Sequence, residues 1–371
     1  MIILQLVTKR QFRGAELSAW NLSRKLVEHG HTVIWVGLYP NHHEVLELDH
    51  AVNIDLPGEH KSFFNLNKAR ALSQVIKEHG VELIQANGAE TLKYAVAAGL
   101  LGAKRPVVYR NISQVSFWMK GSPLKKWVNG FLLKRAQWIV SVGEASRKDM
   151  VQCFPALAPK VSVIQRGVPV KIVDKPAATN FLKSSYSLGE DTRILFWAGA
   201  FSPEKNPGML VEMMKVLRKE HPHIVLLMAG KGPLEENIRN QIQQEGLEKH
   251  ILLTGYQKEL APYYAGADVF VLVSHIEGVP GVILEAAMQQ TPAVTVQVGG
   301  VNEVVEQNVT GVIVDSYQPD AFAHSVVRLL SNQSLREQMG KQAQAFVQQQ
   351  YNEEINTKKF EALYQQLTAS S

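Results

Sequence analysis

The chain alternates between short apolar runs and longer segments in which apolar residues recur with helical spacing. In its first half, the apolar runs predict strands at 2–7, 32–38, 82–86, 106–109, 138–142 and 160–164. The segments between them predict helices at 15–29, 65–79 and 90–101. Repeated alternation of strand and helix is typical of a parallel, doubly wound sheet, so we expect an α/β domain here.

The second half repeats the alternation after a break. Strands are predicted at 193–199, 224–230, 251–255, 269–273, 293–296 and 311–314, with helices that begin near Pro207, Leu234, Leu260, Gly281 and Val301. Between the halves, the periodicity fades and prolines and lysines gather, which is typical of a linker. We predict two doubly wound Rossmann-like domains that face each other across a cleft: 1–168, joined by the C-terminal helical stretch 352–371, and 189–351, with 169–188 as linker.

Size and composition fit a globular protein with substantial cores. The chain has 371 residues, of which 46% are hydrophobic, enough for two domains of ordinary size. Its apolar start is followed by cations, the reverse of the order in a signal peptide, and no uncharged apolar run is long enough to span a bilayer. The lone Cys153 predicts neither an internal disulfide nor a metal or redox motif. We expect a cytoplasmic location.

The net charge of +5 hides an asymmetry between the halves. Residues 1–170 carry 22 Lys and Arg against 12 Asp and Glu, a balance of +10, whereas the rest carries 17 against 22, a balance of −5. A basic first half suggests an anionic partner. Nothing in the sequence resembles a nucleic-acid-binding module, so we expect no nucleic acid.

One segment of the basic half, 117–138, combines aromatic and cationic residues. Together with Ser116 it holds three tryptophans and five cations in 23 residues. This pattern predicts a helix at a lipid headgroup boundary, which would place the protein peripherally on the inner face of an anionic membrane. The alternative is a core helix whose cations extend outward to solvent.

The most informative stretch, 274–288, follows a predicted buried strand and leads into a predicted helix. In an open α/β sheet, ligands bind at the carboxyl ends of strands. Free N–H groups at the helix start, where Gly281 permits close approach, would suit a diphosphate. Glu277 and Glu285 would repel that diphosphate, so we expect them to accept hydrogen bonds from the hydroxyls of a nucleotide-sugar. Alternatively, Glu285 merely complements the helix N-terminus and Glu277 is a solvated loop residue.

Gly14 occupies the first strand-to-helix turn, where a dinucleotide-binding protein carries its glycine fingerprint. The sequence around it lacks three glycines in the required frame, so we expect no NAD cofactor. Gly14 either forms a tight turn or presents a backbone edge to the interdomain cleft.

The second half contains several short blocks in a fixed order: Ala198–Pro207 (AGAFSPEKNP), Ala229–Pro233 (AGKGP), Thr254–Tyr256, 263–273, the glutamate pair, and Val298–Val305 (VGGVNEVV) to Thr310–Gly311. Through these blocks, which stand in family order, it resembles the retaining glycosyltransferases of family 4, which adopt the two-domain GT-B fold. The first half matches more loosely, through Gly14–Glu16, Asn21–Leu22, Gly30–Val33 and Val142–Ser146.

The resemblance implies a role for each matching residue. It implies that Glu277 contacts the donor hexose, that Glu285 holds the ribose diol and that Lys205 grips the diphosphate. It also assigns the backbone of Gly281 and Val282 to the sugar and phosphate. Further donor-binding positions are Gly199, Gly232 and Tyr256, the last two where the base is received. In this fold the first domain receives the acceptor.

Two positions depart from the family pattern. Ala200 stands where many members have an arginine, and the strand at 107–109 runs into Arg110 and Asn111 where a histidine often faces the sugar. We hypothesise that Arg110 supplies the missing cation from the opposite domain. Alternatively, Lys205 and the helix N-terminus suffice.

The resemblance implies transfer of a hexose, with retention, from a UDP- or GDP-sugar to a hydroxyl of a glycan or lipid-linked acceptor in cell-surface polysaccharide or glycolipid synthesis. The nucleotide-sugar is a substrate, so no cofactor is expected. No metal is expected either, because no Asp-x-Asp motif stands at a strand end. Two alternatives stay open: a nucleotide-sugar 2-epimerase on the same fold, and a non-catalytic nucleotide-sugar-binding partner, which Ala200 would permit.

Overall fold

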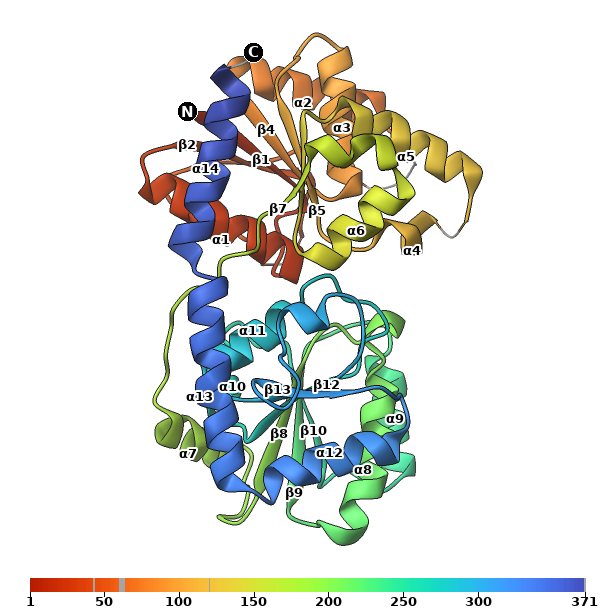
Figure 1. Ribbon diagram of the computed structural model, residues 1–371, viewed down its shortest axis with the longest axis vertical. Coiled ribbons are helices and arrows are strands. Elements are labelled where there is room, and N and C mark those ends of the chain that lie inside the picture. Colours follow the sequence, from red (N-terminus) through yellow and green to blue (C-terminus); the bar gives the residue numbers. More distant parts are fainter. Residues whose placement is uncertain (43, 60–63, 120, 370–371) are drawn as a thin grey trace. The chain divides into compact units, whose positions relative to one another are not determined.

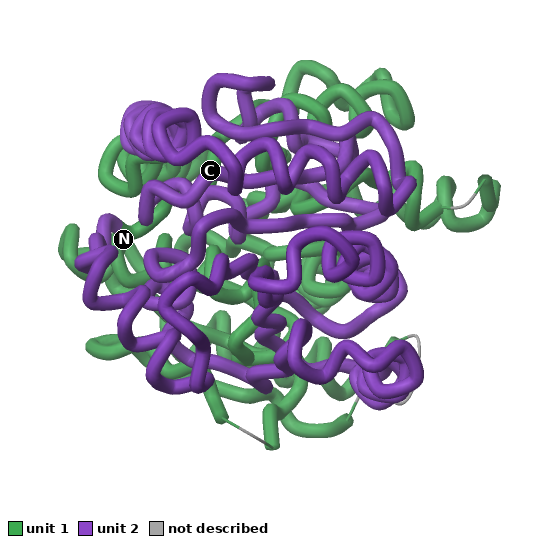
Figure 2. Tube along the Cα trace, turned by 90° about the horizontal axis from the view of Figure 1, so that it is seen from below, with its two compact units in different colours: residues 1–169, 351–371 green, residues 170–350 purple. Residues whose placement is uncertain are grey.

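The structure is a computed structural model, which describes residues 1–42, 44–59, 64–119 and 121–369. It divides into two compact units (Figure 2). The first comprises residues 1–169 together with 351–371, and the second comprises residues 170–350. Each unit is an α/β unit built on a parallel sheet (Figure 1).

The sheet of the first unit has the strand order β3-β2-β1-β4-β5-β6-β7. Its strands are β1 (Ile2–Lys9), β2 (Thr32–Tyr39), β3 (Val52–Asp55), β4 (Leu83–Asn87), β5 (Val107–Asn111), β6 (Trp138–Ser141) and β7 (Val161–Val163). Its helices are α1 (Gly14–Glu28), α2 (Leu66–Glu78), α3 (Ala89–Leu100), α4 (Val115–Met119), α5 (Pro123–Arg135), α6 (Glu144–Cys153), the 3₁₀-helix η1 (Pro155–Lys160) and α14 (Glu353–Ala369). The expected doubly wound architecture is therefore present.

Alternation along the strands sends side chains into two separate cores. In β1, Leu4 and Leu6 point to one face and pack in a cluster with residues of α2 and α3. Ile3 and Val7 point to the other face, where α1 and the C-terminal α14 contribute to the cluster. The segment 353–369, at the end of the sequence, thus completes a core that begins at residue 3.

Strand β3 is the element of the first sheet that the apolar pattern missed. Its four residues, Val-Asn-Ile-Asp, are partly or fully exposed, so they form no apolar run. The strand lies at the sheet edge and pairs with β2 alone among the described strands.

The second sheet has the order β10-β9-β8-β11-β12-β13. Its strands are β8 (Arg193–Ala198), β9 (Ile224–Ala229), β10 (Ile251–Gly255), β11 (Val269–Leu272), β12 (Ala293–Val296) and β13 (Gly311–Val314). Its helices are α7 (Lys175–Ser185), α8 (Pro207–Glu220), α9 (Glu235–Gln244), α10 (Ala261–Gly266), α11 (Gly281–Met288), α12 (Pro319–Leu330) and α13 (Gln333–Gln350), with 3₁₀-helices η2 (Pro203–Lys205) and η3 (Val301–Glu303). The helix expected from Val301 is thus a single 3₁₀ turn.

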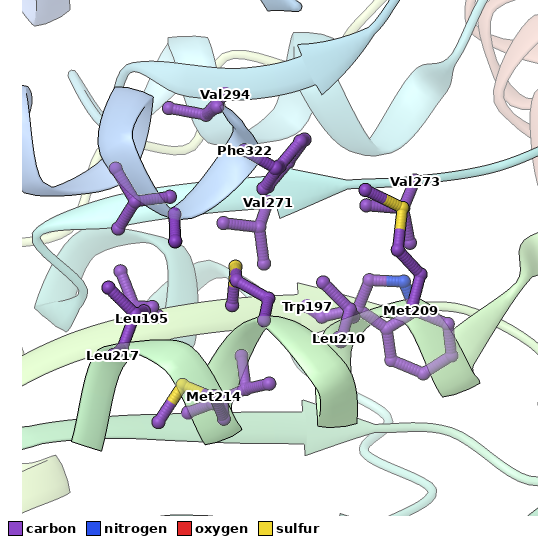
Figure 3. Packing of buried hydrophobic residues seen from close by; sticks show 14 of the residues in the cluster. Leu195, Trp197, Met209, Leu210, Met214, Leu217, Val271, Val273, Val294 and Phe322 are labelled. Atoms are coloured by element: carbon purple, nitrogen blue, oxygen red, sulfur yellow. The ribbon is translucent and has the colours of Figure 1, made fainter. Parts of the chain in front are cut away.

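One core cluster of this unit packs strands of the sheet against helices that include α8 and α12 (Figure 3). Strand residues such as Leu195 and Val271 are fully buried against Leu210 of α8 and Phe322 of α12. Each such side chain contributes about 1.5–3 kcal/mol by leaving water. This packing holds the strands in register and so fixes the loops at their carboxyl ends.

The segment 169–188 was expected to be a linker. The structure differs, because this segment contains the helix α7. The Asp174 side chain caps this helix by accepting from the N–H of Ala177. Leu182 is fully buried and lies so close to Gly266 of α10 that a Cβ there would be 2.6 Å from it. The prolines that suggested a linker are compatible with a helix, since one of them stands in its first turn.

Candidate functional site

The second sheet has a topological switch point between β8 and β11. From β8 the chain moves outward through β9 to β10, and then returns to the other side of β8 with β11. The loops that follow β8 and β11 therefore diverge, and in open α/β sheets ligands bind at this point. Lys205 lies in the loop after β8, and Glu277 lies in the loop after β11.

The two loops are tied to each other and to their surroundings. The backbone N–H of His275 donates to the carbonyl oxygen of Glu204 at 2.8 Å. The Tyr317 hydroxyl donates to the carbonyl oxygen of Ser274 at 2.8 Å, and its ring lies 5.0 Å from that of His275. These contacts bring the backbone beside Lys205 to the backbone that leads into Glu277.

The far side of the β11 loop is fixed by the glycines after β12. The N–H of Gly300 donates to the carbonyl oxygen of Gly278 at 2.9 Å. Gly299 has a φ of +50°, and a Cβ there would lie 1.9 Å from the Glu277 carbonyl oxygen. Only glycine leaves room for this approach, which explains the Gly-Gly pair in the sequence.

Lys205 and Glu277 form an ion pair across the switch point. Lys205 Nζ donates to Glu277 Oε1 at 2.6 Å. The glutamate side chain is 9% exposed and the lysine side chain 29% exposed. The lysine neutralises a nearly buried carboxylate while its own side chain stays partly exposed to solvent. The sequence analysis expected both residues in one site but did not expect this direct contact.

Helix α11 begins directly after this pair with an uncapped N-terminus. Pro280 occupies the N-cap position in an extended conformation, and no side chain caps the helix. The first N–H groups, at Gly281 and Val282, have no partner inside the helix, and they carry the positive end of the helix dipole. Such an end favours an anion.

Glu285 lies one turn further along α11. Its Oε2 accepts a hydrogen bond from the hydroxyl of Tyr264 at 3.2 Å. Tyr264 is 1% exposed, so its ring is held by packing and can orient the carboxylate. The contact with Tyr264 was not foreseen, because 21 residues separate it from Glu285.

The turns after β8 and β9 lie against each other through glycines. A Cβ at Gly230, whose φ is +146°, would be 1.8 Å from the carbonyl oxygen of Gly199. A Cβ at Gly232 would be 2.5 Å from the carbonyl oxygen of Phe201. Tyr256, which follows β10, is 37% exposed. The carboxyl ends of the strands of the second sheet therefore carry Gly199, Gly232 and Tyr256 as well as Lys205 and Glu277. Ala200, beside Gly199, is exposed.

Two of the predicted site residues, Gly14 and Arg110, belong to the first unit. Gly14 opens α1, and a Cβ there would meet nothing within 4 Å. Arg110 is 2% exposed on β5. Its Nη2 donates to Ser18 Oγ at 2.9 Å, and its guanidinium lies 5.6 Å from the ring centre of Phe360 on α14.

The Arg110 guanidinium is only partly satisfied by these contacts. Its Nε and Nη1 are buried without a hydrogen-bond partner. Burial lowers the pKa of Arg110 to about 10, with a further lowering from the nearby charge of Arg166. A cavity of about 10 Å³ beside it, with room for about one water molecule, is lined by residues of α1 and α14. Arg110 thus faces the interior of its own unit, and its contact with a donor stays a prediction.

The residues that the sequence did not identify as part of the site mainly hold the predicted site residues and their loops in place. Tyr317, Tyr264 and the Glu204 carbonyl contact site residues from a distance in sequence, which no motif could reveal. Ser274 is fully buried at the end of β11 with an unpartnered hydroxyl. In the described part of the chain, no three His, Cys, Asp or Glu side chains are grouped so as to hold a metal, and no helix is long and apolar enough to cross a bilayer.

Comparisons with known proteins agree with this arrangement. A family model for group 1 glycosyl transferases matches residues 179–346, and one for glycosyltransferase family 4 matches residues 12–171. An Escherichia coli UDP-Gal:alpha-D-GlcNAc-diphosphoundecaprenol alpha-1,3-galactosyltransferase is 25% identical over 292 residues, 76% of this chain and 73% of that protein. Alpha-D-kanosaminyltransferase of Streptomyces kanamyceticus is 27% identical over 225 residues, 60% of this chain. The chain spans 58% of that protein's length, and 61% of a Bacillus subtilis relative.

Solved structures resemble the whole chain. HepE from Anabaena, in complex with UDP and glucose, matches with a TM-score of 0.86 and 20% identity over 97% of this chain and 98% of its own. Sucrose-phosphate synthase from Thermosynechococcus elongatus matches with a TM-score of 0.84 and 20% identity over 100% of both chains. The fold and the two family matches define a glycosyltransferase of the GT-B type. The chain belongs to the group 1 glycosyltransferases of family 4.

Proposed function

We propose that the protein transfers a hexose, with retention of anomeric configuration, from a UDP- or GDP-sugar to a hydroxyl of a glycan or lipid-linked acceptor. The observation that carries this proposal is the Lys205–Glu277 pair at the switch point, beside the uncapped start of α11. Relatives named for UDP-galactose and for GDP-mannose support the donor class, and one of them is named for a diphosphoundecaprenol acceptor. The expected setting is cell-surface polysaccharide or glycolipid synthesis.

Donor binding would exchange the partner of Lys205. The diphosphate competes for the ammonium group of the partly exposed Lys205, and it also meets the N–H groups of Gly281 and Val282. Glu277, released from the lysine, can then accept hydrogen bonds from hexose hydroxyls. Glu285, oriented by Tyr264, can accept from the ribose diol. The ion pair of the free protein thus keeps the site charge-balanced until the donor arrives.

The chemical step needs stabilisation of the leaving diphosphate. The bond between the anomeric carbon and the phosphate oxygen breaks, and negative charge develops on that oxygen. Lys205 and the α11 N–H groups are fixed donors for this charge. The acceptor oxygen bonds to the anomeric carbon on the same face, and its proton passes to the departing phosphate oxygen. The residues present can therefore supply the positive charge without a metal.

The first test is a screen of UDP, GDP and their sugars by thermal unfolding. A ligand that binds only the folded state at 100 times its Kd stabilises it by about 2.7 kcal/mol. We expect one nucleotide series to raise the melting temperature, and Lys205→Ala to abolish the rise for the diphosphates. No stabilisation by any nucleotide would contradict the proposal.

Product analysis separates the proposed reaction from its alternatives. The stabilising nucleotide-sugar is incubated with the enzyme, with and without a polyprenyl-diphosphate sugar acceptor, and followed by NMR. Transfer requires the acceptor and releases the nucleoside diphosphate. A 2-epimerase would convert the donor without any acceptor. A non-catalytic partner would be stabilised by the nucleotide but would leave the donor unchanged.

A further inference from the structure

Helices α4 and α5 expose a group of large apolar side chains, which we call the α4–α5 face. It comprises Phe117 (40% exposed), Trp118 (52%), Leu124 (70%), Trp127 (70%) and Phe131 (39%). Of the 13 residues of α5, Leu133 is the buried one. A surface helix of this length normally buries an apolar stripe. Here the larger apolar stripe faces solvent, and α5 lies at the periphery of the first unit beside α3 (Figure 1).

The exposed side chains of α5 form one continuous stripe. Leu124, Trp127 and Phe131 are spaced by three and four residues, so they lie on the same side of the helix. The rings of Trp127 and Phe131 stack with centres 6.1 Å apart. The Arg135 guanidinium lies 3.6 Å from the centre of the Phe131 ring and continues the stripe. The stripe is thus apolar in its middle and cationic at its end.

Charge on this face has one sign. Between Glu90 and Glu144 the sequence contains nine Lys and Arg and no Asp or Glu. On α5, Lys125, Lys126, Lys134 and Arg135 are all exposed. Within the described residues, none of these four forms an ion pair with a carboxylate.

Neighbouring carboxylates are already engaged. Asp149 of α6 accepts from the N–H and the hydroxyl of Ser116, at the start of α4. Glu144 pairs with Arg147 at 2.6 Å. Neither carboxylate forms an ion pair with a cation of α5 in the described residues, so α6 offsets the positive charge of the α4–α5 face only in part.

The arrangement distinguishes the two interpretations that the sequence left open. A core helix with outward-reaching cations would bury Leu124 and Trp127, but both are 70% exposed. Tryptophans with flanking lysines are typical of a helix that lies in a lipid interface, with its apolar side chains among acyl chains and its cations among phosphates. An acidic protein partner would match the charge but would not require a projecting tryptophan stripe.

We propose that the α4–α5 face docks the protein onto an anionic lipid surface, with Leu124, Trp127 and Phe131 inserted and Lys125, Lys126, Lys134 and Arg135 among the headgroup phosphates. This inference goes beyond the proposed reaction and does not depend on it, since it concerns a surface distinct from the residues around Lys205. If both hold, the acceptor is a lipid-linked one that the enzyme meets in the membrane plane.

The test measures binding of the full chain to sedimenting vesicles, without donor or acceptor. One set of vesicles contains phosphatidylcholine alone, and the other contains equal parts of phosphatidylcholine and phosphatidylglycerol. We expect binding to the anionic vesicles to be stronger by two orders of magnitude or more, about five-fold for each of the four cations, and to weaken as salt is added. Quenching of tryptophan emission by brominated acyl chains should accompany binding, because Trp118 and Trp127 would reach the lipid.

Variants separate the charge from the apolar stripe. Lys125→Gln with Lys126→Gln should weaken binding to anionic vesicles by roughly 25-fold, about five-fold for each lysine. Leu124→Ser with Trp127→Ser should weaken it on the order of ten-fold and reduce the quenching. Lys219→Gln with Lys249→Gln is the matched control for the charge, and Leu100→Ser is the control for loss of an exposed leucine; all three positions are exposed and lie outside the face. The controls should bind as the unchanged protein does.

The proposal fails in three clear ways. Equal binding to both vesicle types, or no binding to either, would overturn it. Binding that survives both pairs of substitutions would also overturn it. If vesicles do not bind but the Trp127 variant alters the sedimentation coefficient of the lipid-free protein, the face is an interface between copies of the chain. The substituted side chains are exposed, so unchanged melting temperatures would show that each variant is folded.

Discussion

The two units have switch points of the same kind, between β1 and β4 in the first and between β8 and β11 in the second. Polar side chains near the first one bind other parts of the protein. Arg10, at the end of β1, forms hydrogen bonds of 2.8 and 3.0 Å with the carboxylate of Asp55, and Asn87 of β4 donates to Gln5. Near the second, Lys205 holds a single carboxylate and stays partly accessible beside an uncapped helix. The two units thus have the same kind of switch point but differ in its side chains. We expect that only at the second can a cation, Lys205, leave its carboxylate for an anionic ligand.

The largest effect is expected when the positive charge of Lys205 is removed from the second switch point. Lys205→Ala should lower kcat/KM by about 10²–10³, because a preorganised donor to developing charge is worth about 2.7–4 kcal/mol. Steady-state kinetics with the donor found by thermal screening would measure the loss. Lys219→Ala, an exposed lysine of α8, is the matched control and should leave kcat/KM unchanged. An active Lys205→Ala enzyme would mean that the second switch point does not bind the leaving group.

The next largest effect is expected at the glycine that joins the turns after β8 and β9. Gly230→Ala places a Cβ 1.8 Å from the Gly199 carbonyl oxygen at a φ of +146°, so the two turns must separate. We expect a loss of about 3 kcal/mol in the free energy of unfolding of the second unit, measured by urea denaturation, together with weaker nucleotide binding.

Gly14→Ala is the matched change in the first unit. A Cβ at Gly14 meets nothing within 4 Å, so we expect the free energy of unfolding to change by less than about 1 kcal/mol, towards higher stability. If donor or acceptor kinetics nevertheless deteriorated, the backbone of Gly14 would have a functional role. If Gly230→Ala were as harmless as Gly14→Ala, the close contact between the two turns would not matter for the site.

The sequence predicted the parts of this molecule that follow from local pattern. Apolar runs located β12 and β13 to the residue, and the motif around Glu277 placed α11 at Gly281. Strand β3 was not predicted, because its residues are partly or fully exposed at the edge of the sheet and form no apolar run. Helix α7 escaped because Ala178 and Leu182 are its buried residues, too few for a clear period.

The site shows the same division between local and distant information. Lys205, Glu277 and Glu285 were named because each lies within a short block that matches the family. Their contacts with each other and with Tyr264 depend on strand order, which places segments far apart in the sequence at one edge. Arg110 was proposed as a catalytic cation because the family often has a histidine facing the sugar at this strand and an arginine at the position of Ala200. Strand alternation directs its side chain towards α1 and α14, and its contact with a donor stays a prediction.

Substitution of Arg110 tests whether its guanidinium group contacts a ligand or is only buried within the first unit. Arg110→Met keeps an unbranched side chain of similar length but removes a buried, partly unsatisfied cation. We expect kcat to fall by less than ten-fold and the free energy of unfolding to rise by about 1 kcal/mol, as when buried charges are replaced by apolar groups. A fall of two or more orders of magnitude in kcat, with stability unchanged, would support donor contact by Arg110.

The smallest effect concerns the charges that bind α14 to α1 within the first unit. The ring of His29 contacts Glu361 at 2.9 Å and Glu354 at 3.2 Å. Burial lowers the pKa of His29, but these carboxylates outweigh burial and leave that pKa raised. The other charged and titratable groups around this contact are Arg24, Lys25 and Glu28 on α1, His31 after it, and Glu353 and Lys358 on α14.

Because the folded pKa of His29 lies above its unfolded value, protonation stabilises the contact. The stabilisation is complete below about pH 6.5, the unfolded value, and is lost as pH rises through the folded pKa. The pKa of Glu354 is lowered, chiefly by its hydrogen bond to Lys358, so its contribution is lost only in more acidic solution. We expect amide hydrogen exchange in 353–369, corrected for intrinsic rates, to show about 0.5 kcal/mol less protection at pH 8 than at pH 6. His29→Asn should remove that difference, and a difference that persists in this variant would show that His29 is not its source.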